Sequence, residues 1–238
     1  MPYRKQQFVN GEIYHIVARR IEDNLLFEDV DDYYRGIFSI YEFNNNKSVT
    51  IRERRAIRAR IKASRDPTPV TDDRGLFVEV LLFSFMPNHI HLLLRQFRDG
   101  GISKFMQKLG AGYSAYFKNK YKLKRKGHFF QGRFVAVHIA TEEQLKTVFV
   151  YIHTNSVALI EPNWKEVGIR NPDKAIEFVE NYKWSSYPDY IGKKNFPSVT
   201  KRDFILKVMG GEQGCKEFVE SWIKYKGKIR EFADLALE

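Results

Sequence analysis

Two histidines separated by one residue, His89 and His91, lie in the apolar segment Met86-Pro87-Asn88-His89-Ile90-His91-Leu92-Leu93-Leu94. This composition predicts a strand, in which alternate side chains point to the same face. Both imidazoles can then bind one ion while Ile90 and Leu92 turn toward a core. Imidazole is the commonest protein metal ligand, but two imidazoles leave a divalent ion short of ligands. A third ligand and a reacting group must therefore come from elsewhere in the chain.

Asn155 is a candidate for the third ligand, and Tyr151 is a candidate for the reacting group. They are four residues apart in residues 147–155, a stretch with helical character. Residues at this spacing share one helix face, so the phenol and the amide can be presented together to the ion. A hard cation such as Mg²⁺ or Mn²⁺ prefers oxygen ligands and leaves positions open for phosphate oxygens. It would polarise the phosphorus atom that a tyrosine attacks. The candidate ligands are therefore His89, His91 and Asn155, and the candidate nucleophile is Tyr151.

These residues resemble the single-tyrosine transposases of the HUH superfamily, in the IS200-like and REP-associated branch. In that family the histidine strand follows Met-Pro-Asn or Met-Pro-Asp, as residues 86–91 do here. Four further blocks follow the order of the family: Ile13–Arg19 resembles its first strand, Gly127–Phe134 its Gly-x-x-x-Gln-Gly-Arg-Phe segment, Tyr151–Val157 its Tyr-Ile-His-x-Asn-Pro-Val block, and Trp184–Tyr187 a common downstream element.

One position in these blocks departs from the family pattern. Ser156 stands where the family has proline. A proline would bias Asn155 away from helical angles and help to end the helix, whereas serine leaves that ending to other forces.

The resemblance implies an α+β fold with an antiparallel sheet flanked by helices, that is, an HUH or ferredoxin-like core. It implies cleavage and rejoining of single-stranded DNA with hairpin elements through a 5′-phosphotyrosine at Tyr151, by a monomer or a homodimer. We expect residues 1–160 to form the catalytic domain, with a basic insertion at 44–75. Residues 161–238 should form a helical C-terminal appendage.

The composition agrees with a nucleic-acid partner. The 238 residues carry a formal net charge of +11 and a pI near 9.5, which favours partners that bear phosphate. A hydrophobic content of 43% is enough for a core and argues against overall disorder. The single cysteine, Cys215, excludes an intrachain disulfide and a cysteine-based zinc cluster. We expect a cytoplasmic, nucleoid-associated protein, because neither a long apolar run nor a signal peptide is recognisable.

Basic residues gather in two segments. Residues 47–75 could be a basic helix that follows a DNA backbone or a solvated insertion without a partner, and the pattern leaves both open. Residues 122–127 predict a phosphate-binding loop, with an unpaired basic turn as the alternative. The residues expected to contact DNA are Lys122, Lys124, Arg125, Lys126, Arg133, Arg52, Arg55 and Arg58.

Periodicity predicts the elements that position these groups. We expect strands at 12–19, 76–85, 89–96 and 134–139, and helices at 29–43, 102–121, 175–182, 201–209 and 217–232. Thr141 and Gln144 form a capping signal for the helix that carries Tyr151. The strands at 76–85 and 89–96 should pair antiparallel through a Pro-Asn turn and place the histidines on an inner strand.

Two other functions remain open. The chain could be a non-catalytic single-stranded nucleic-acid-binding protein whose histidines are core residues. It could also be a metal-dependent hydrolase in which water attacks. We do not expect His15, His128 or His153 to be ligands. Tyr113 and Tyr116 are weaker nucleophile candidates, because Phe117 and Lys120 stand four residues after them where an oxygen ligand is needed.

Overall fold

A four-stranded antiparallel sheet forms the centre of the chain. The computed structural model describes residues 7–63, 72, 74–123 and 127–235. The strand order is β2-β3-β1-β4, with β1 at Ile13–Arg19, β2 at Val78–Met86, β3 at His89–Gln96 and β4 at Val135–Ile139. β2 and β3 pair antiparallel, with Met86 opposite His89. The predicted hairpin and the inner position of the histidine strand are therefore confirmed.

Helices surround this sheet and make the fold α+β, as predicted. They are α1 (Val30–Phe43), α2 (Ile51–Ala63), α3 (Gly101–Lys120), α4 (Glu142–Thr154), α5 (Trp164–Val167), α6 (Pro172–Asn181), α7 (Tyr187–Tyr190), α8 (Asp203–Met209) and α9 (Gly211–Leu235). Two 3₁₀ turns, η1 (Ile21–Asp23) and η2 (Asn155–Leu159), complete the described elements.

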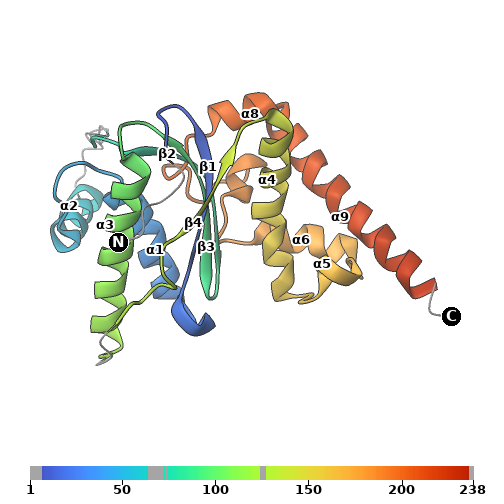
Figure 1. Cartoon of the computed structure of the whole chain (residues 1–238), viewed down its shortest axis with the longest axis horizontal. Helices are drawn as coiled ribbons and strands as arrows, with labels where there is room; N and C mark the ends of the chain where they lie inside the picture. The colour runs from blue at the N-terminus through green and yellow to red at the C-terminus, as the bar shows by residue number, and fades with distance from the viewer. Residues whose placement is uncertain (1–6, 64–71, 73, 124–126, 236–238) are drawn as a thin grey trace.

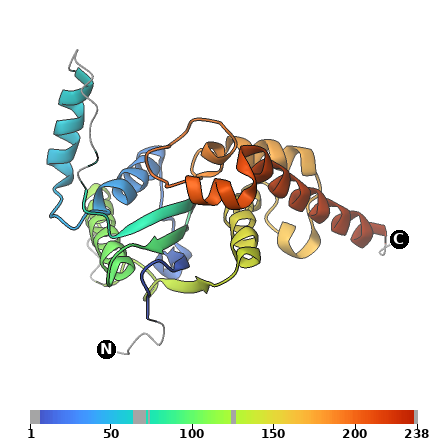
Figure 2. The same ribbon diagram turned by 90° about the horizontal axis from the view of Figure 1, so that it is seen from above.

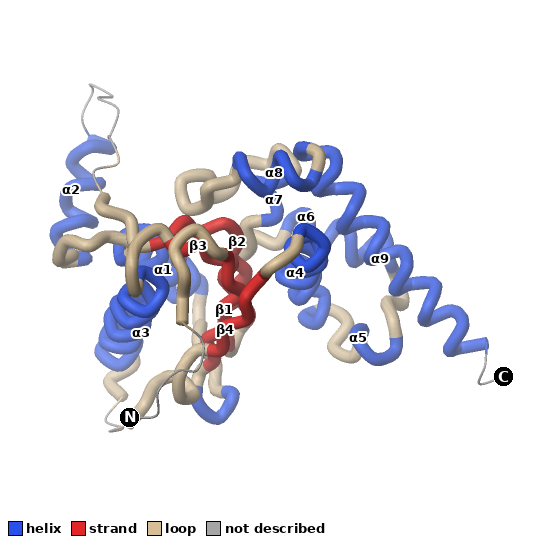
Figure 3. The backbone as a smooth tube through the Cα atoms, turned by 45° about the horizontal axis from the view of Figure 1, so that its top comes forward, coloured by secondary structure: helices blue, strands red, loops and turns tan. Residues whose placement is uncertain are grey.

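The sheet lies between two helical layers (Figures 1 and 3), with α1 and α3 on one face and α4 and the C-terminal helices on the other. Alternation along β3 separates the two cores. Ile90 and Leu92 belong to the first core, whereas Leu93 belongs to the second. Because His89 and His91 have the same parity as Leu93, their side chains are directed to the face that carries α4. The prediction that Ile90 and Leu92 turn toward a core is confirmed.

The C-terminal helices are packed on the second face of the sheet. Val219 and Ile223 of α9 share the second core with Leu81 and Leu93 of the sheet. The Trp184–Tyr187 element runs along β2, where the amide of Phe85 donates to the carbonyl of Trp184 at 2.8 Å. These contacts cover the β2 edge. The division into two domains at residue 160 stays a prediction.

The helix of the basic insertion, α2, projects from the body of the molecule beside α1 (Figure 2). Its inner side is held by Glu42, a buried carboxylate of α1, which pairs with Arg54 at 3.0 Å and with Arg58 at 2.8 Å. The Arg58 guanidinium also lies 4.9 Å from the centre of the Phe38 ring. The described helix of the insertion, α2, is therefore anchored to the first helical layer.

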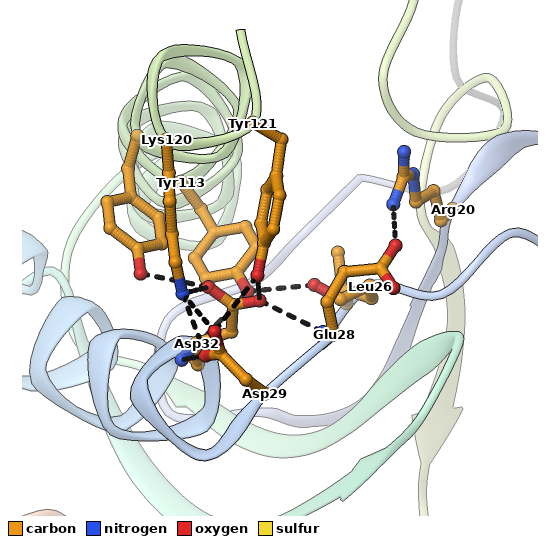
Figure 4. Close-up of polar contacts among 9 residues, drawn as sticks. Arg20, Leu26, Glu28, Asp29, Asp32, Tyr113, Lys120 and Tyr121 are labelled. Carbon is orange, nitrogen blue, oxygen red and sulfur yellow. Dashed lines mark hydrogen bonds and ion pairs between the residues drawn. The ribbon is translucent and has the colours of Figure 1, made fainter. Parts of the chain in front are cut away.

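A polar network joins the C-terminal end of α3 to the start of α1 (Figure 4). The carboxylate of Asp32 is fully buried and accepts from Lys120 at 2.8 Å, from Tyr121 at 2.7 Å and from Tyr116 at 2.9 Å. The hydroxyl of Tyr113 donates to the carbonyl of Leu26 at 2.8 Å. Three of the tyrosines of this region thus serve to fix one helix to another.

Candidate active site

The two histidines of β3 meet at their outer nitrogen atoms. The Nε2 atoms of His89 and His91 are 3.0 Å apart, and the His91 side chain is 3% exposed. This contact follows from the strand, because residues two apart project from the same face. The sequence prediction that both imidazoles can address one ion agrees with this geometry.

The end of α4 adds Asn155 to this pair. Its side-chain Nδ2 lies 3.1 Å from Nε2 of His91 and 3.4 Å from Nε2 of His89. Asn155 has helical angles, φ −56° and ψ −29°, and its backbone N–H donates to the carbonyl of Tyr151. A proline at position 156 would disfavour these angles, whereas Ser156 allows the chain to continue from α4 into η2. Ser156 is therefore compatible with a chain that continues from α4 directly into a 3₁₀ turn.

Tyr151 stands on the same face of α4, one turn earlier. Its ring centre is 5.6 Å from that of His91 and 5.9 Å from that of His15, and the residue is 39% exposed. The phenol is thus close to the histidine pair and open to solvent. Tyr113 and Tyr116, in contrast, have their hydroxyls engaged with Leu26 and Asp32.

Two neighbouring groups orient the histidine rings. The Nδ1 of His89 lies 2.6 Å from Oδ1 of Asn88, which can only accept, so Nδ1 carries the proton and Nε2 presents a lone pair. The Nδ1 of His91 lies 3.0 Å from Nε2 of His15. A proton on Nδ1 of His91, donated to His15, leaves Nε2 of His91 as a lone pair as well. Such partners are what fix the tautomer of a metal-binding imidazole.

The histidines of the site are neutral at physiological pH. Burial, together with the charges of Arg19 and Lys165, lowers the pKa of His89 to about 4. Burial and the neighbouring His89 and His15 hold the pKa of His91 well below its usual value. Neutral imidazole is the form that binds metals. These rings therefore need no deprotonation before they bind a cation.

The three polar groups fit a divalent cation. Cis ligands about 2.1 Å from an octahedral ion are about 3.0 Å apart, which is the separation of the two Nε2 atoms. Among the described residues no group of three His, Cys, Asp or Glu side chains is placed to hold a metal, since His15 contacts His91 on the far side of its ring. Asn155, with its amide turned so that Oδ1 faces the histidines, would be the third ligand of such a cation.

Lys165 is a residue of this site that the sequence reasoning missed. Its Nζ donates to Oδ1 of Asn155 at 2.6 Å and lies 4.8 Å from the centre of the Tyr151 ring. It follows Asn155 by ten residues, on α5, and no periodic pattern connects the two. His15 was also missed as a partner of His91, because alternation alone does not reveal which strand pairs with β1. Its position diagonal to His91 follows from the β1–β3 register, in which His15 is opposite Leu93.

The other histidines lie apart from this cluster. His153 is fully buried and its Nε2 is 3.0 Å from Oγ of Ser186, so it packs α4 onto the Trp184–Tyr187 element. His128 is an exposed residue ahead of β4. Neither contacts the histidine pair in the described structure.

The residues expected to contact DNA differ in their exposure and in their contacts within the protein. Lys122, Arg133, Arg52 and Arg55 are exposed, and Arg133 lines a shallow pocket with Arg19 and Gln131. Arg58 is engaged by Glu42 and by aromatic rings of α1, which makes it a weaker candidate. Lys124, Arg125 and Lys126 lie outside the described residues.

Comparison with known proteins agrees with the resemblance. Residues 73–155, from the segment before β2 to Asn155, match the family described as "Transposase IS200 like". The matched segment covers less than half of the chain and contains the histidine strand, Tyr151 and Asn155. The resemblance inferred from the motifs is confirmed, and the matched transposase segment ends at the last of the candidate ligands, Asn155. A search of the curated proteins found no match.

Solved structures are also similar to this chain. One of them is a REP-associated tyrosine transposase bound to a REP hairpin, and the similarity covers 85% of this chain and 93% of that chain, with 11% sequence identity and a TM-score of 0.44. No helix in the described part of the chain is both long and apolar enough to cross a membrane.

Proposed function

We propose that this protein is a transposase that cleaves and rejoins single-stranded DNA through a covalent 5′-phosphotyrosine at Tyr151. The observation that carries the proposal is the meeting of an exposed phenol with a neutral histidine pair. The ring of Tyr151 is 5.6 Å from the ring of His91, whose Nε2 is 3.0 Å from that of His89. Tyrosine is a nucleophile in covalent catalysis when its surroundings activate it.

The proposed reaction exchanges one phosphate ester for another. The Tyr151 oxygen attacks phosphorus in line, the bond from phosphorus to the 3′ oxygen breaks, and the phenol proton ends on the leaving 3′ oxygen. The downstream fragment stays attached to the enzyme through its 5′-phosphate, and the upstream fragment of the same strand ends in a free 3′-hydroxyl. Because the ester is conserved, a 3′-hydroxyl can attack the phosphotyrosine in the reverse sense and join strands without ATP.

Residues His89, His91 and Asn155 would hold a divalent cation, Mg²⁺ or Mn²⁺, which supplies Lewis-acid stabilisation of the phosphate charge when bound. His15 and Asn88 hold the imidazoles in the ligand tautomer, and burial keeps both rings neutral. The phenol of Tyr151 is kept on the same side by the last turn of α4.

The proposed substrate is single-stranded DNA with a hairpin element. A positive surface charge supports a phosphate-bearing partner, because the formal net charge is +11. The similar REP-associated enzyme was solved with a REP hairpin, which makes hairpin oligonucleotides the first substrates to test. A cytoplasmic, nucleoid-associated location and a monomeric or homodimeric state remain part of the proposal.

Incubation with a labelled hairpin oligonucleotide and Mn²⁺ tests this function against its rivals. A DNA adduct that survives denaturation and maps to Tyr151 is the expected result. Free 5′-phosphate without an adduct would instead favour a hydrolase in which water attacks. Binding without cleavage would favour a nucleic-acid-binding protein whose histidines are structural.

A further inference from the structure

The ammonium group of Lys165 lies where the candidate ligand and the candidate nucleophile meet. Its Nζ is 2.6 Å from Oδ1 of Asn155 and 4.8 Å from the centre of the Tyr151 ring. Asn155 and Tyr151 come from the last turn of α4, whereas Lys165 comes from α5. The Lys165 ammonium therefore contacts both groups from a different helix, α5. This helix lies beyond the matched segment 73–155.

The backbone under Lys165 is fixed by its neighbour in the chain. Trp164 is 3% exposed and belongs to the second hydrophobic core. Its amide donates to the carbonyl of Glu161 at 3.2 Å, and its carbonyl accepts from the amide of Gly168 at 3.0 Å. The α carbon of Lys165 is thus held at the rim of the site, while the long side chain is exposed and can change its partner.

The charge of Lys165 is not neutralised by the described part of the protein. Within it, no carboxylate lies at ion-pair distance from Nζ, in contrast to Lys120, which pairs with Asp29 and Asp32. Its near neighbours are an amide, a phenol and neutral imidazoles. Ammonium groups of this kind are common phosphate ligands, acting as point charges.

Metal binding would release this ammonium. In the described arrangement Oδ1 of Asn155 points to Lys165 and Nδ2 points to the histidines. Turning the amide to offer Oδ1 to a cation would bring its NH₂ group toward Lys165, and two donors cannot bond each other. Lys165 would then have to exchange the amide oxygen for another acceptor, and a phosphate oxygen beside Tyr151 is the acceptor that the substrate brings.

We propose that Lys165 is a further catalytic residue, whose ammonium binds a non-bridging oxygen of the DNA phosphate that Tyr151 attacks. This inference rests on the proposed function, since it concerns the same phosphate. The ammonium keeps its proton and forms no covalent bond. It supplies a fixed positive charge where negative charge grows as phosphorus gains its fifth oxygen. One preorganised donor at such a position contributes about 100-fold in rate.

The first test compares Lys165→Ala with Lys174→Ala, which removes the same charge from an exposed position on α6. Lys165→Ala should form the DNA adduct about 100-fold more slowly, and Lys174→Ala at the wild-type rate. In binding assays with Mn²⁺, with Tyr151→Phe in every protein to prevent cleavage, only Lys165→Ala should lower the salt slope, by about 0.7 for one phosphate contact. Lys165→Arg should recover part of the rate because it keeps the charge, whereas Lys165→Gln should not.

A substrate with a methylphosphonate at the scissile position locates the contact. Each diastereomer lacks one non-bridging oxygen, so one of them removes the acceptor of Lys165. That diastereomer should slow the wild type more than it slows Lys165→Ala, which has no ammonium contact left to lose. Equal slowing of both proteins by both diastereomers would overturn the proposal.

Mn²⁺ affinity, measured by calorimetry without DNA, distinguishes a phosphate contact of Lys165 from a structural role in supporting Asn155. Loss of a competing donor and of a nearby positive charge should leave the affinity of Lys165→Ala equal to that of the wild type or above it. A lower affinity would mean that Lys165 merely supports Asn155, and would contradict the inference. Failure of the proposed function looks different, because the wild type itself would then form no adduct.

Discussion

Two groups of tyrosines in this chain show how surroundings decide what a phenol does. On α3, the Tyr113 hydroxyl is bonded to Leu26 (Figure 4). The Tyr116 hydroxyl is bonded to Asp32. Burial, followed by the hydrogen bond to Asp32, raises the pKa of Tyr116 above its ordinary value. On α4, Tyr151 faces neutral rings and a lysine and is 39% exposed. A carboxylate therefore makes a phenol a structural donor, whereas a cationic, open setting leaves it available for attack.

Removal of single tyrosine hydroxyls is expected to give the largest difference between the two groups of tyrosines. Tyr151→Phe should abolish the covalent DNA adduct and leave DNA affinity and thermal stability nearly unchanged, because only an exposed hydroxyl is lost. Tyr113→Phe should keep the adduct and lose about 1 kcal/mol of unfolding free energy, since a buried hydrogen bond disappears. Gel detection of the adduct and urea denaturation measure the two effects. An adduct that persists in Tyr151→Phe, or that maps to Tyr113 or Tyr116, would contradict the assignment.

Substitutions at the histidine pair, which test the proposed metal site beside Tyr151, should have the next largest effect. His89→Ala and His91→Ala should each remove cleavage and weaken Mn²⁺ binding without unfolding the chain. His15→Ala, which removes only the partner of His91, should lower metal affinity about 10-fold to 100-fold. Calorimetry with Mn²⁺ gives the affinities and circular dichroism checks folding. Unchanged affinity in both direct variants would make these histidines core residues.

Among the polar groups that join α3 to α1, Asp32 should contribute most to the free energy of unfolding. Asp32→Asn should cost about 3 kcal/mol of unfolding free energy, because a buried carboxylate bonded to Lys120 is lost. Burial alone would raise the pKa of Asp32, but the hydrogen bonds from Lys120 and Tyr121 hold it below its ordinary value.

The pH dependence of stability tests the same carboxylate. A lowered folded-state pKa means that this stabilisation is complete above the unfolded pKa, about 3.9, and is lost as pH falls through the folded value. The stability difference between wild type and Asp32→Asn should therefore be constant near neutral pH and shrink below about pH 4. A difference that stays constant into that acid range would show that folding does not lower the pKa of Asp32.

The smallest effect concerns the basic insertion. Alanine at three exposed arginines of α2, Arg52, Arg55 and Arg60, should flatten the salt slope of single-stranded DNA binding by about 2 if all three contact phosphates. The change should be similar for different DNA sequences. A control that removes three exposed charges from α8 and α9 uses Lys207, Lys224 and Lys228. If the salt slope of the arginine variant equals that of the wild type, α2 is a solvated insertion.

Point substitutions are preferable here to removal of residues 47–74. Deletion would leave Glu42, a buried carboxylate, without Arg54 and Arg58. A buried charge that loses its partners is strongly destabilising, so the loss of binding could reflect unfolding.

Local patterns were sufficient to predict the sheet and the centre of the site. Alternation around His89 and His91 predicted a strand, and the cap at Thr141 predicted the start of α4, where the Thr141 hydroxyl accepts from the Gln144 amide at 3.2 Å. The spacing of Tyr151 and Asn155 placed both on one face. Each of these signals lies within a few residues along the chain, where strand and helix geometry is fixed.

The missing parts depend on contacts between distant segments. Lys165 reaches Asn155 only because η2 turns the chain back and Trp164 is buried, and neither has a periodic signature. His15 meets His91 through strand register, which alternation within β1 does not determine. The four-residue helices α5 and α7 are too short to display helical periodicity.

The position of α4 on its own sheet has a kinetic consequence. Tyr151 approaches the histidines of the same chain, so a single polypeptide contains every group of the proposed cleavage step. Adduct formation should then be first order in protein at limiting concentrations. A mixture of Tyr151→Phe and His91→Ala chains should not regain activity by complementation. Restored activity would instead mean that two chains exchange this helix, so that each composite site takes its tyrosine from one chain and its imidazoles from the other.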